Sequence, residues 1–170
     1  MKKNSMVMTV AYGGVIAALY VVLTFVANAF GLANNAIQVR FSEALTILPF
    51  FTPAAIPGVF IGCLISNTLT GCILIDTIGG SLTTLVAAVC TYLIGKKKPL
   101  GNASKWVAPI PPILFNTIVV PFILAYAYQI PGGVPYFMLT VGAGEVISCG
   151  VLGMILYFAL EKRAASIFNR

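Results

Sequence analysis

The sequence predicts an all-α integral membrane protein whose 170 residues form a single domain of six transmembrane helices. Two observations carry this prediction. First, 59% of the residues are hydrophobic and only 8% are charged, a balance typical of proteins embedded in a bilayer. Second, basic residues cluster between apolar runs, at Lys2–Lys3, at Lys96–Lys98 with Lys105, and at Lys162–Arg163. Such clusters mark cytoplasmic loops, so both termini and the lysine-rich loop are predicted to be cytoplasmic.

The first predicted span covers residues 8–30. Its apolar run exceeds a signal-peptide core of about 7–15 residues and matches the ~20 residues that cross a bilayer, so we interpret it as a retained helix. Small residues recur four positions apart in this span, Gly13 with Ala17 and Gly14 with Ala18. A strip of small residues lets another helix approach closely. That neighbour belongs either to the same bundle or to a different subunit.

After a polar break at residues 31–37, two short apolar segments are predicted at residues 41–51 and 58–70. The first would extend only about 16 Å as a helix, roughly half of a ~30 Å hydrocarbon core. Thr52-Pro53 and Ile56-Pro57 are expected to break the chain between the two segments. The pair therefore forms either two short or tilted crossings or a re-entrant unit, and both arrangements return the chain to the outer face near Gly71.

Three longer spans are predicted at residues 77–95, 106–128 and 136–160. Trp106 stands at the start of the second of these, where aromatic side chains anchor a helix at the membrane interface. Prolines are expected to bend that span at Pro109, Pro111, Pro112 and Pro121. The turn-rich stretch Q-I-P-G-G-V-P separates the last two spans.

Residues 38–45, Q-V-R-F-S-E-A-L, place an arginine and a carboxylate directly before apolar sequence. On a helix, Arg40 and Glu43 would share one face, so they can pair with each other or share a bound polar molecule. Unpaired charge inside a bilayer costs at least ~2.5 kcal/mol per residue, so both must face a bundle interior or a water-filled cavity. A structural ion pair and a binding site both satisfy this requirement.

Other polar residues are predicted to lie at similar depths and to converge with Arg40 and Glu43: Gln38, Asn67, Asp76, Asn116 and Glu145. Intramembrane ionisable groups indicate a functional site by default. Structural alternatives remain for each. The asparagines can bridge helices, Asp76 can cap the helix that follows it, and Glu145 can be a protonated acid between helices. Aromatic residues nearby either cover the ligand or form an interfacial belt: Tyr126, Tyr128, Tyr136 and Phe137.

A site with one arginine, several carboxylates and two amides suits a small planar ligand that has both hydrogen-bond donors and acceptors. Carboxylates accept the paired N–H donors of a guanine-like edge and also neutralise an alkylammonium group. The sequence has no histidine, and its cysteines lack a metal-ligand spacing, so we predict no metal, no cofactor and four small buried thiols: Cys63, Cys72, Cys90 and Cys149. A phosphate-binding G-x-x-x-x-G-K-[ST] loop is also absent, so uphill transport would need another subunit to hydrolyse ATP.

The chain resembles the substrate-binding (S) components of energy-coupling factor (ECF) vitamin transporters, and within them the QueT group associated with queuosine precursors. The resemblance covers nearly the whole chain and rests above all on residues 38–45, L-P-F-F at 48–51, residues 58–62 and Ser66-Asn67. It implies a multi-pass protein of the bacterial cell membrane that captures a 7-deazaguanine such as preQ1, queuine or queuosine with high affinity. Glu43 or Glu145 would then accept the guanine-like N–H edge, and another acid would meet an amine.

The resemblance also implies partners, namely a transmembrane coupling subunit and two ATPase subunits. The small-residue strip is similar to the motif by which S components contact the coupling subunit, and here it reads Gly-xxx-Ala instead of Ala-xxx-Ala: Gly13, Gly14, Ala17 and Ala18. Two rival classes remain. A stand-alone channel or facilitator would pass a small polar solute without partners. A membrane enzyme would use paired carboxylates as acid and base, but the sequence shows no nucleophile–base spacing, so we expect no enzyme activity.

Overall fold

The computed structural model describes residues 2–32 and 38–168, and every regular element in these ranges is a helix. Four helical stretches are long and apolar enough to cross a membrane: Met6–Ala29, Leu74–Lys97, Gly101–Ala127 and Val134–Glu161. Two shorter apolar helices, Phe41–Phe50 and Ala55–Leu69, lie between the first and the second of these in sequence. The prediction of an α-helical membrane protein is confirmed, and the six segments follow the predicted order with bounds that differ by a few residues.

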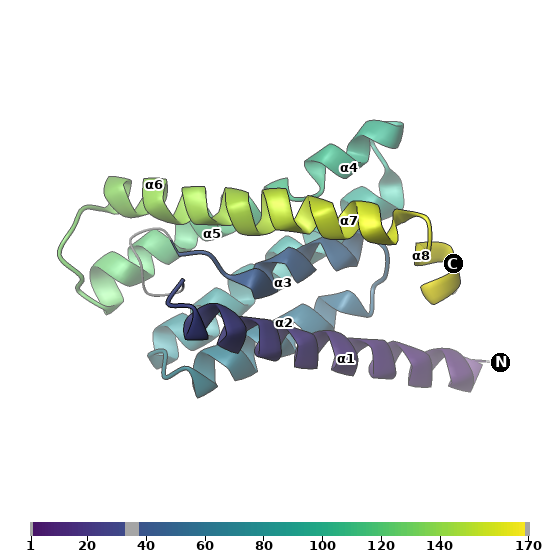
Figure 1. Ribbon diagram of the computed structural model, residues 1–170, viewed down its shortest axis with the longest axis horizontal. Coiled ribbons are helices and arrows are strands. Elements are labelled where there is room, and N and C mark those ends of the chain that lie inside the picture. The colour runs from purple at the N-terminus through teal and green to yellow at the C-terminus, as the bar shows by residue number, and fades with distance from the viewer. Residues whose placement is uncertain (1, 33–37, 169–170) are drawn as a thin grey trace.

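Figure 1 shows the helices side by side, with α1 along one edge of the bundle and the continuous α6–α7 helix along the opposite edge. The elements are α1 (Lys2–Ala29), η1 (Phe41–Phe50), α2 (Ala55–Leu69), α3 (Leu74–Lys97), η2 (Gly101–Ala103), α4 (Ser104–Val107), α5 (Ile110–Phe122), η3 (Ile123–Ala127), α6 (Val134–Glu145), η4 (Val146–Leu152), α7 (Gly153–Glu161) and α8 (Ala164–Ile167). Most of the predicted polar break, residues 33–37, lies outside the described residues, as do the side chains of Lys2 and Lys3.

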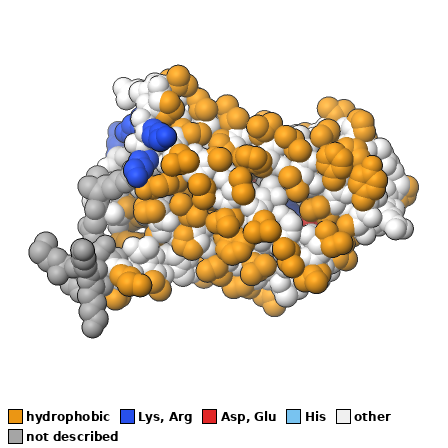
Figure 2. Space-filling model, turned by 180° about the vertical axis from the view of Figure 1, so that it is seen from behind, with side chains coloured by type: hydrophobic (Ala, Val, Ile, Leu, Met, Phe, Trp, Pro, Cys, Tyr) orange, Lys and Arg blue, Asp and Glu red, His pale blue; other side chains and the backbone are white. Residues whose placement is uncertain are grey.

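Polarity is distributed as a bilayer requires. Large hydrophobic side chains are exposed along all the long helices, and they cover the flank seen in Figure 2. By contrast, the interior holds many threonine, serine, asparagine and acidic side chains. On the face seen in Figure 2, the exposed Lys and Arg side chains gather at one end of the molecule, which we call the lysine end; Arg40 is not among them. Apolar side chains are therefore placed to face lipid, and many polar side chains lie inside the bundle.

The short helix η1 lies at the centre of the molecule, between α1 and α7 (Figure 1). It is a 3-10 helix in which every residue but Phe41 is buried. A ten-residue 3-10 helix is unusually long for its type, and irregular backbone at membrane depth is tolerated only inside protein. Its last residue, Phe50, lies close to the lysine end, because its carbonyl oxygen is so near Gly95 that a Cβ on this glycine would clash with it. This position agrees with two short crossings by η1 and α2.

The expected chain break at Ile56-Pro57 is wrong, because α2 already begins at Ala55 and Pro57 lies in its first turn. Backbone N–H groups in the first turn of a helix have no partner within that helix, so a proline there costs no hydrogen bond. The span predicted at residues 106–128 is interrupted as its prolines suggest, since α4 ends at Val107 and α5 starts at Ile110. A π-helical turn, η3, follows Pro121.

Half of the small-residue strip on α1 packs inside the bundle. Gly13 and Ala17 are buried, and α2 contacts this face so closely that a Cβ on Gly58 would lie 2.9 Å from the Gly13 carbonyl oxygen. Gly14 and Ala18 are exposed on the flank, and a Cβ on Gly14 would meet nothing within 4 Å. The predicted close neighbour within the same bundle is therefore found at Gly13 and Ala17, whereas contact of Gly14 and Ala18 with another subunit stays a prediction.

Candidate functional site

All seven predicted site residues line one cavity in the half of the bundle opposite the lysine end: Gln38, Arg40, Glu43, Asn67, Asp76, Asn116 and Glu145. They come from the extended segment before η1, from η1 itself, and from α2, α3, α5 and α6. The cavity has a narrow inner part of about 30 Å³ and a wider outer part of about 400 Å³, and several lining residues are common to both. The predicted convergence of these side chains is thus present in the fold, while their role in binding stays a prediction.

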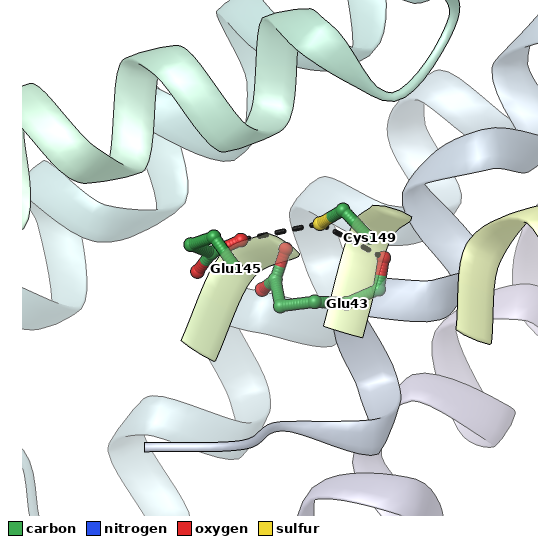
Figure 3. Close-up of side chains that lie close together, drawn as sticks. All are labelled: Glu43, Glu145 and Cys149. Carbon is green, nitrogen blue, oxygen red and sulfur yellow. Dashed lines mark hydrogen bonds between the residues drawn. The ribbon is translucent and has the colours of Figure 1, made fainter. Parts of the chain in front are cut away.

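The inner part of the cavity is dominated by Glu43 and Glu145. Figure 3 shows the Glu43 side chain extending toward Glu145, with Cys149 beside them. Ligand atoms of these three residues lie within 4.8 Å of one another. The Cys149 thiol donates to Glu145 Oε2 at 3.1 Å and to the Glu43 carbonyl oxygen at 3.5 Å. Hydrogen bonds link the three groups, and the predicted lack of a metal stays a prediction.

Glu43 is the most constrained of the acids, with 3% of its surface exposed. The Tyr20 hydroxyl donates a hydrogen bond to Glu43 Oε1. The other oxygen, Oε2, is buried and has no hydrogen-bond partner among the described residues. A buried carboxylate oxygen without a donor is costly, so Oε2 is an acceptor that a ligand could satisfy.

Arg40 and Glu43 do not form the ion pair that the sequence left open. The ion pair found in the described chain is Lys105–Glu161, at 3.6 Å and near the lysine end. The Arg40 guanidinium lines the cavity and makes no hydrogen bond or ion pair with the described residues. Its backbone N–H donates to Ser148 Oγ at 3.1 Å, which ties residues 38–40 to η4. The charged group is therefore held at the cavity and kept available.

Asp76 lies where the inner and outer parts of the cavity meet. It does not cap α3, since Ile73 is the N-cap residue and no side chain caps this helix. Instead, Asp76 Oδ2 accepts a hydrogen bond from the Tyr128 hydroxyl at 2.9 Å, and the Ile73 N–H donates to the same hydroxyl at 3.2 Å. Burial and the adjacent Asp76 carboxylate raise the pKa of Tyr128, so this phenol stays protonated at neutral pH.

The four cysteines are free thiols, and they are buried to different degrees. Cys63 lines the inner cavity, where it accepts weak hydrogen bonds of 3.6 Å from Asn67 Nδ2 and from Thr84 Oγ1. Cys72 lines the outer part and is not bridged to Cys63. Cys63 and Cys72 therefore line the cavity, and Cys63 also accepts hydrogen bonds there, whereas the sequence predicted only small buried hydrophobic residues.

Some residues that shape the site were not predicted from the sequence: Tyr20, Cys149, Gly80, Thr84, Asn28 and Thr24. The burial of Tyr20 could have been predicted from its spacing. Gly13, Ala17 and Tyr20 are four and three residues apart, so they lie on the same, buried face of α1. Cys149 lies four residues after Glu145, but it is in the π-helical η4, whose register the sequence does not reveal. For Tyr128, the sequence left two roles open, either covering the ligand or belonging to an interfacial aromatic belt. The structure places Tyr128 in the lining of the cavity mouth.

These features define an α-helical, multi-pass membrane protein with a buried polar cavity. The family model described as QueT transporter matches residues 10–162. The chain therefore belongs to the QueT transporter family, which confirms the resemblance at that level. Membership of a transporter family also supports the expectation that the chain is not an enzyme.

A stretch of 72 residues is 43% identical to the Queuosine precursor transporter QueT of Lactococcus lactis subsp. cremoris (strain MG1363). This stretch covers 42% of the chain and 42% of the relative, so the match spans less than half of either protein. No solved structure matches the chain.

Proposed function

We propose that this chain is the high-affinity substrate-binding subunit of an ECF-type importer, and that its substrate is a queuosine precursor, a 7-deazaguanine such as preQ1, queuine or queuosine. Family membership supports a role in transport, and the name of the Lactococcus relative supports the class of substrate. The observation that carries the proposal is the convergence of all seven predicted polar residues on one cavity. In that cavity Glu43 Oε2 and the Arg40 guanidinium have no hydrogen-bond partner among the described residues.

The chemistry of the cavity matches a guanine-like base. Such a base presents N–H donors next to a carbonyl oxygen, and the cavity presents the Glu43 and Glu145 carboxylates together with the Arg40 guanidinium. The outer part, about 400 Å³, falls within the ~300–1,000 Å³ that is usual for small-molecule sites. A small planar ligand with both donors and acceptors is therefore accommodated.

The cavity is closed toward the lysine end, which favours binding over free passage. Directly after Glu43, η1 contributes Leu45, Ile47, Leu48 and Phe50 to the hydrophobic core, where they pack with residues of α1, α2, α3 and α7. A separate recess of about 220 Å³ lies beyond this core and is lined by Lys98, Lys105 and Glu161 among others. A packed core between the two spaces is expected of a binding subunit that needs partners to complete transport.

The proposed partners are a transmembrane coupling subunit and two ATPases, and the proposed location is the bacterial plasma membrane with both termini in the cytoplasm. The lysine end would then face the cytoplasm, since basic residues concentrate on that side. The exposed pair Gly14 and Ala18 offers a flat strip on which a helix of the coupling subunit can pack closely.

Calorimetry on the purified chain in detergent tests the proposed substrate class. The ligands are preQ1, queuine, guanine and riboflavin. Tight one-to-one binding of a deazaguanine, with much weaker binding of guanine and none of riboflavin, is expected. A folded sample that binds neither deazaguanine would overturn the proposal.

The same preparation tests the stand-alone facilitator. Liposomes containing only this chain should bind labelled preQ1 at their surface without accumulating it in the lumen. Time-dependent equilibration of preQ1 across these liposomes would assign the chain to the facilitators instead.

A further inference from the structure

The two parts of the cavity differ in size, and this difference limits how a ligand can lie. The inner part, about 30 Å³, has room for one or two water molecules, or for the polar atoms at one edge of a ring. The outer part, about 400 Å³, has room for the body of a heterocycle and its substituent. Arg40, Asp76 and Asn67 line both parts. A bound base must therefore point one polar edge inward and place its substituent toward the mouth.

The inner end offers both acceptors and donors. Glu43 Oε2 is buried without a partner, and the Glu145 carboxylate lies beside it. The Asn116 amide completes the lining of this end and does not reach the outer part. A ring edge that carries adjacent N–H groups and a carbonyl oxygen satisfies such a mixed set, whereas an isolated ammonium would leave the amide donor without an acceptor.

The carboxylate at the outer end is that of Asp76, and it differs from the inner carboxylates in its hydrogen-bond partner and in the space beside it. Asp76 Oδ2 is occupied by the Tyr128 hydroxyl, whereas Oδ1 lies on the side of Gly80, whose missing side chain leaves space next to it. A Cβ on Gly80 would come within 3.3 Å of this oxygen and 3.4 Å of the Asn67 amide nitrogen. Apart from Arg40 and Asp76, the residues that line the mouth are uncharged, and they include the polar side chains of Thr70 and Asn28.

Charge across the whole cavity is unbalanced toward acid. The inner and outer parts together are lined by three carboxylates, Glu43, Asp76 and Glu145, against one cation, Arg40. The positive charge of Arg40 balances only one of the three carboxylates. A ligand with a positive charge would therefore be attracted by the remaining carboxylates.

We propose that Asp76 is the specificity-determining residue for the ligand's substituent: it binds an ammonium group there, while Glu43 and Glu145 bind the edge of the base. This assignment rests on the proposed function and fixes one orientation of the ligand, with the base edge inward and the cationic substituent at the mouth. Tyr128 holds Asp76 in position by its hydrogen bond to the second oxygen.

The test compares two ligands of equal shape, 7-aminomethyl-7-deazaguanine and its neutral isostere 7-ethyl-7-deazaguanine, by calorimetry on the full chain. The wild type should prefer the aminomethyl compound by roughly tenfold or more, the effect of one charge-assisted contact. Asp76→Asn should lose this preference and bind both compounds alike. Glu43→Gln should weaken both compounds by a similar factor and keep the preference.

Tyr128→Phe removes the hydrogen bond that positions Asp76 but leaves the carboxylate, so it should lower the preference for the ammonium less than Asp76→Asn does. Asp76→Ser serves as a second variant if the amide variant does not fold, and it should also lose the preference. The assignment is overturned if the wild type binds both compounds equally, if Asp76→Asn keeps the preference, if Glu43→Gln removes it, or if Tyr128→Phe lowers it more than Asp76→Asn does. Failure of the wild type to bind either compound would instead contradict the proposed function.

Discussion

Glu43 shows how single residues create a site inside a membrane protein. Tyr20 fixes one carboxylate oxygen, and the surrounding η1 backbone buries the side chain almost completely. The second oxygen has no hydrogen-bond donor among the described residues. Burying an incompletely bonded carboxylate costs several kcal/mol, so its retention is best explained by a ligand that supplies the missing donor.

Gly80 gives a prediction at the same scale. Gly80→Ala places a methyl group beside Asp76 Oδ1 and the Asn67 amide, in the cavity lining. Crowding of this kind costs about 1–3 kcal/mol, so the Kd for the deazaguanine should rise roughly 5- to 150-fold. Alanine also favours the helix by about 1 kcal/mol over glycine, so the melting temperature should hold or rise.

Gly79→Ala is the control for this prediction, because its Cβ would meet only the mobile end of the Ile123 side chain, at 3.3 Å and outside the cavity. Calorimetry and thermal unfolding on both variants separate the two effects. Equal affinity for Gly80→Ala and the wild type would show that the ligand does not occupy the space next to Asp76.

The sequence was most informative about these charged residues. Ionisable groups are so unfavourable in a bilayer that Arg40, Glu43 and Glu145 could be placed in a common interior from their positions alone. The partner of each group could not be predicted, because pairing depends on side-chain contacts between helices. The interpretation of Cys149 only as a small hydrophobe therefore missed its hydrogen bond to Glu145.

At the scale of elements, the site depends on how closely α6 approaches the segment before η1. A Cβ on Gly144 would clash with the Gln38 carbonyl oxygen, so only glycine permits this contact. The approach brings Glu145 and the Arg40 backbone to the same side of the cavity, where Ser148 accepts the Arg40 N–H. The geometry of the charged groups is thus set by a contact between two backbones.

Gly144→Ala should therefore weaken ligand binding by at least tenfold, because residues 38–40 must move, and overpacking should cost about 1–3 kcal/mol of stability. Gly150→Ala, in the neighbouring η4 of the same continuous helix, is the matched control, since its Cβ would find its nearest atom at 3.7 Å. It should bind as the wild type does. Normal ligand affinity in Gly144→Ala would contradict this account of the α6 contact.

The sequence was sufficient to predict where the helices lie, but not where their backbone departs from a regular α-helix. The apolar runs and the lysine clusters located all six segments, because length and hydropathy dominate in a bilayer. The sequence did not indicate that η1 is a 3-10 helix or that η3 and η4 are π-helical. These departures depend on tertiary packing around the cavity, which periodicity along one segment does not contain.

The whole molecule has two distinct ends, and this polarity suggests how it works. Apart from Arg40, the described basic side chains seen in Figure 2 gather at one end, and the cavity opens in the half away from it. The beginning of α1 and the last described helix, α8, also lie at the lysine end, where the Tyr12 hydroxyl donates to the Ile167 carbonyl oxygen. The proposed function, with capture of the ligand outside and release inside, requires two ends that differ in this way.

A prediction at this scale concerns the exposed strip on α1. Ala18→Leu adds bulk to the flank where a coupling subunit would pack, far from the cavity lining. It should leave the Kd for preQ1 unchanged but strongly reduce uptake into cells that carry the coupling subunit and the ATPases. Ala159→Leu, on the exposed face of α7, is the control and should retain uptake. Full uptake with Ala18→Leu would remove this strip as the docking surface.

The central claim is that the intramembrane carboxylates bind a deazaguanine, and titration of preQ1 into the wild type, Glu43→Gln and Glu161→Gln tests it most directly. Loss of one charge-assisted hydrogen bond, worth roughly 1.5–3 kcal/mol, predicts about 10- to 150-fold weaker binding for Glu43→Gln. Glu161→Gln makes the same chemical change near the lysine end, at the Lys105 ion pair, and should bind like the wild type. Unchanged affinity in both Glu43→Gln and a parallel Glu145→Gln variant would contradict the claim.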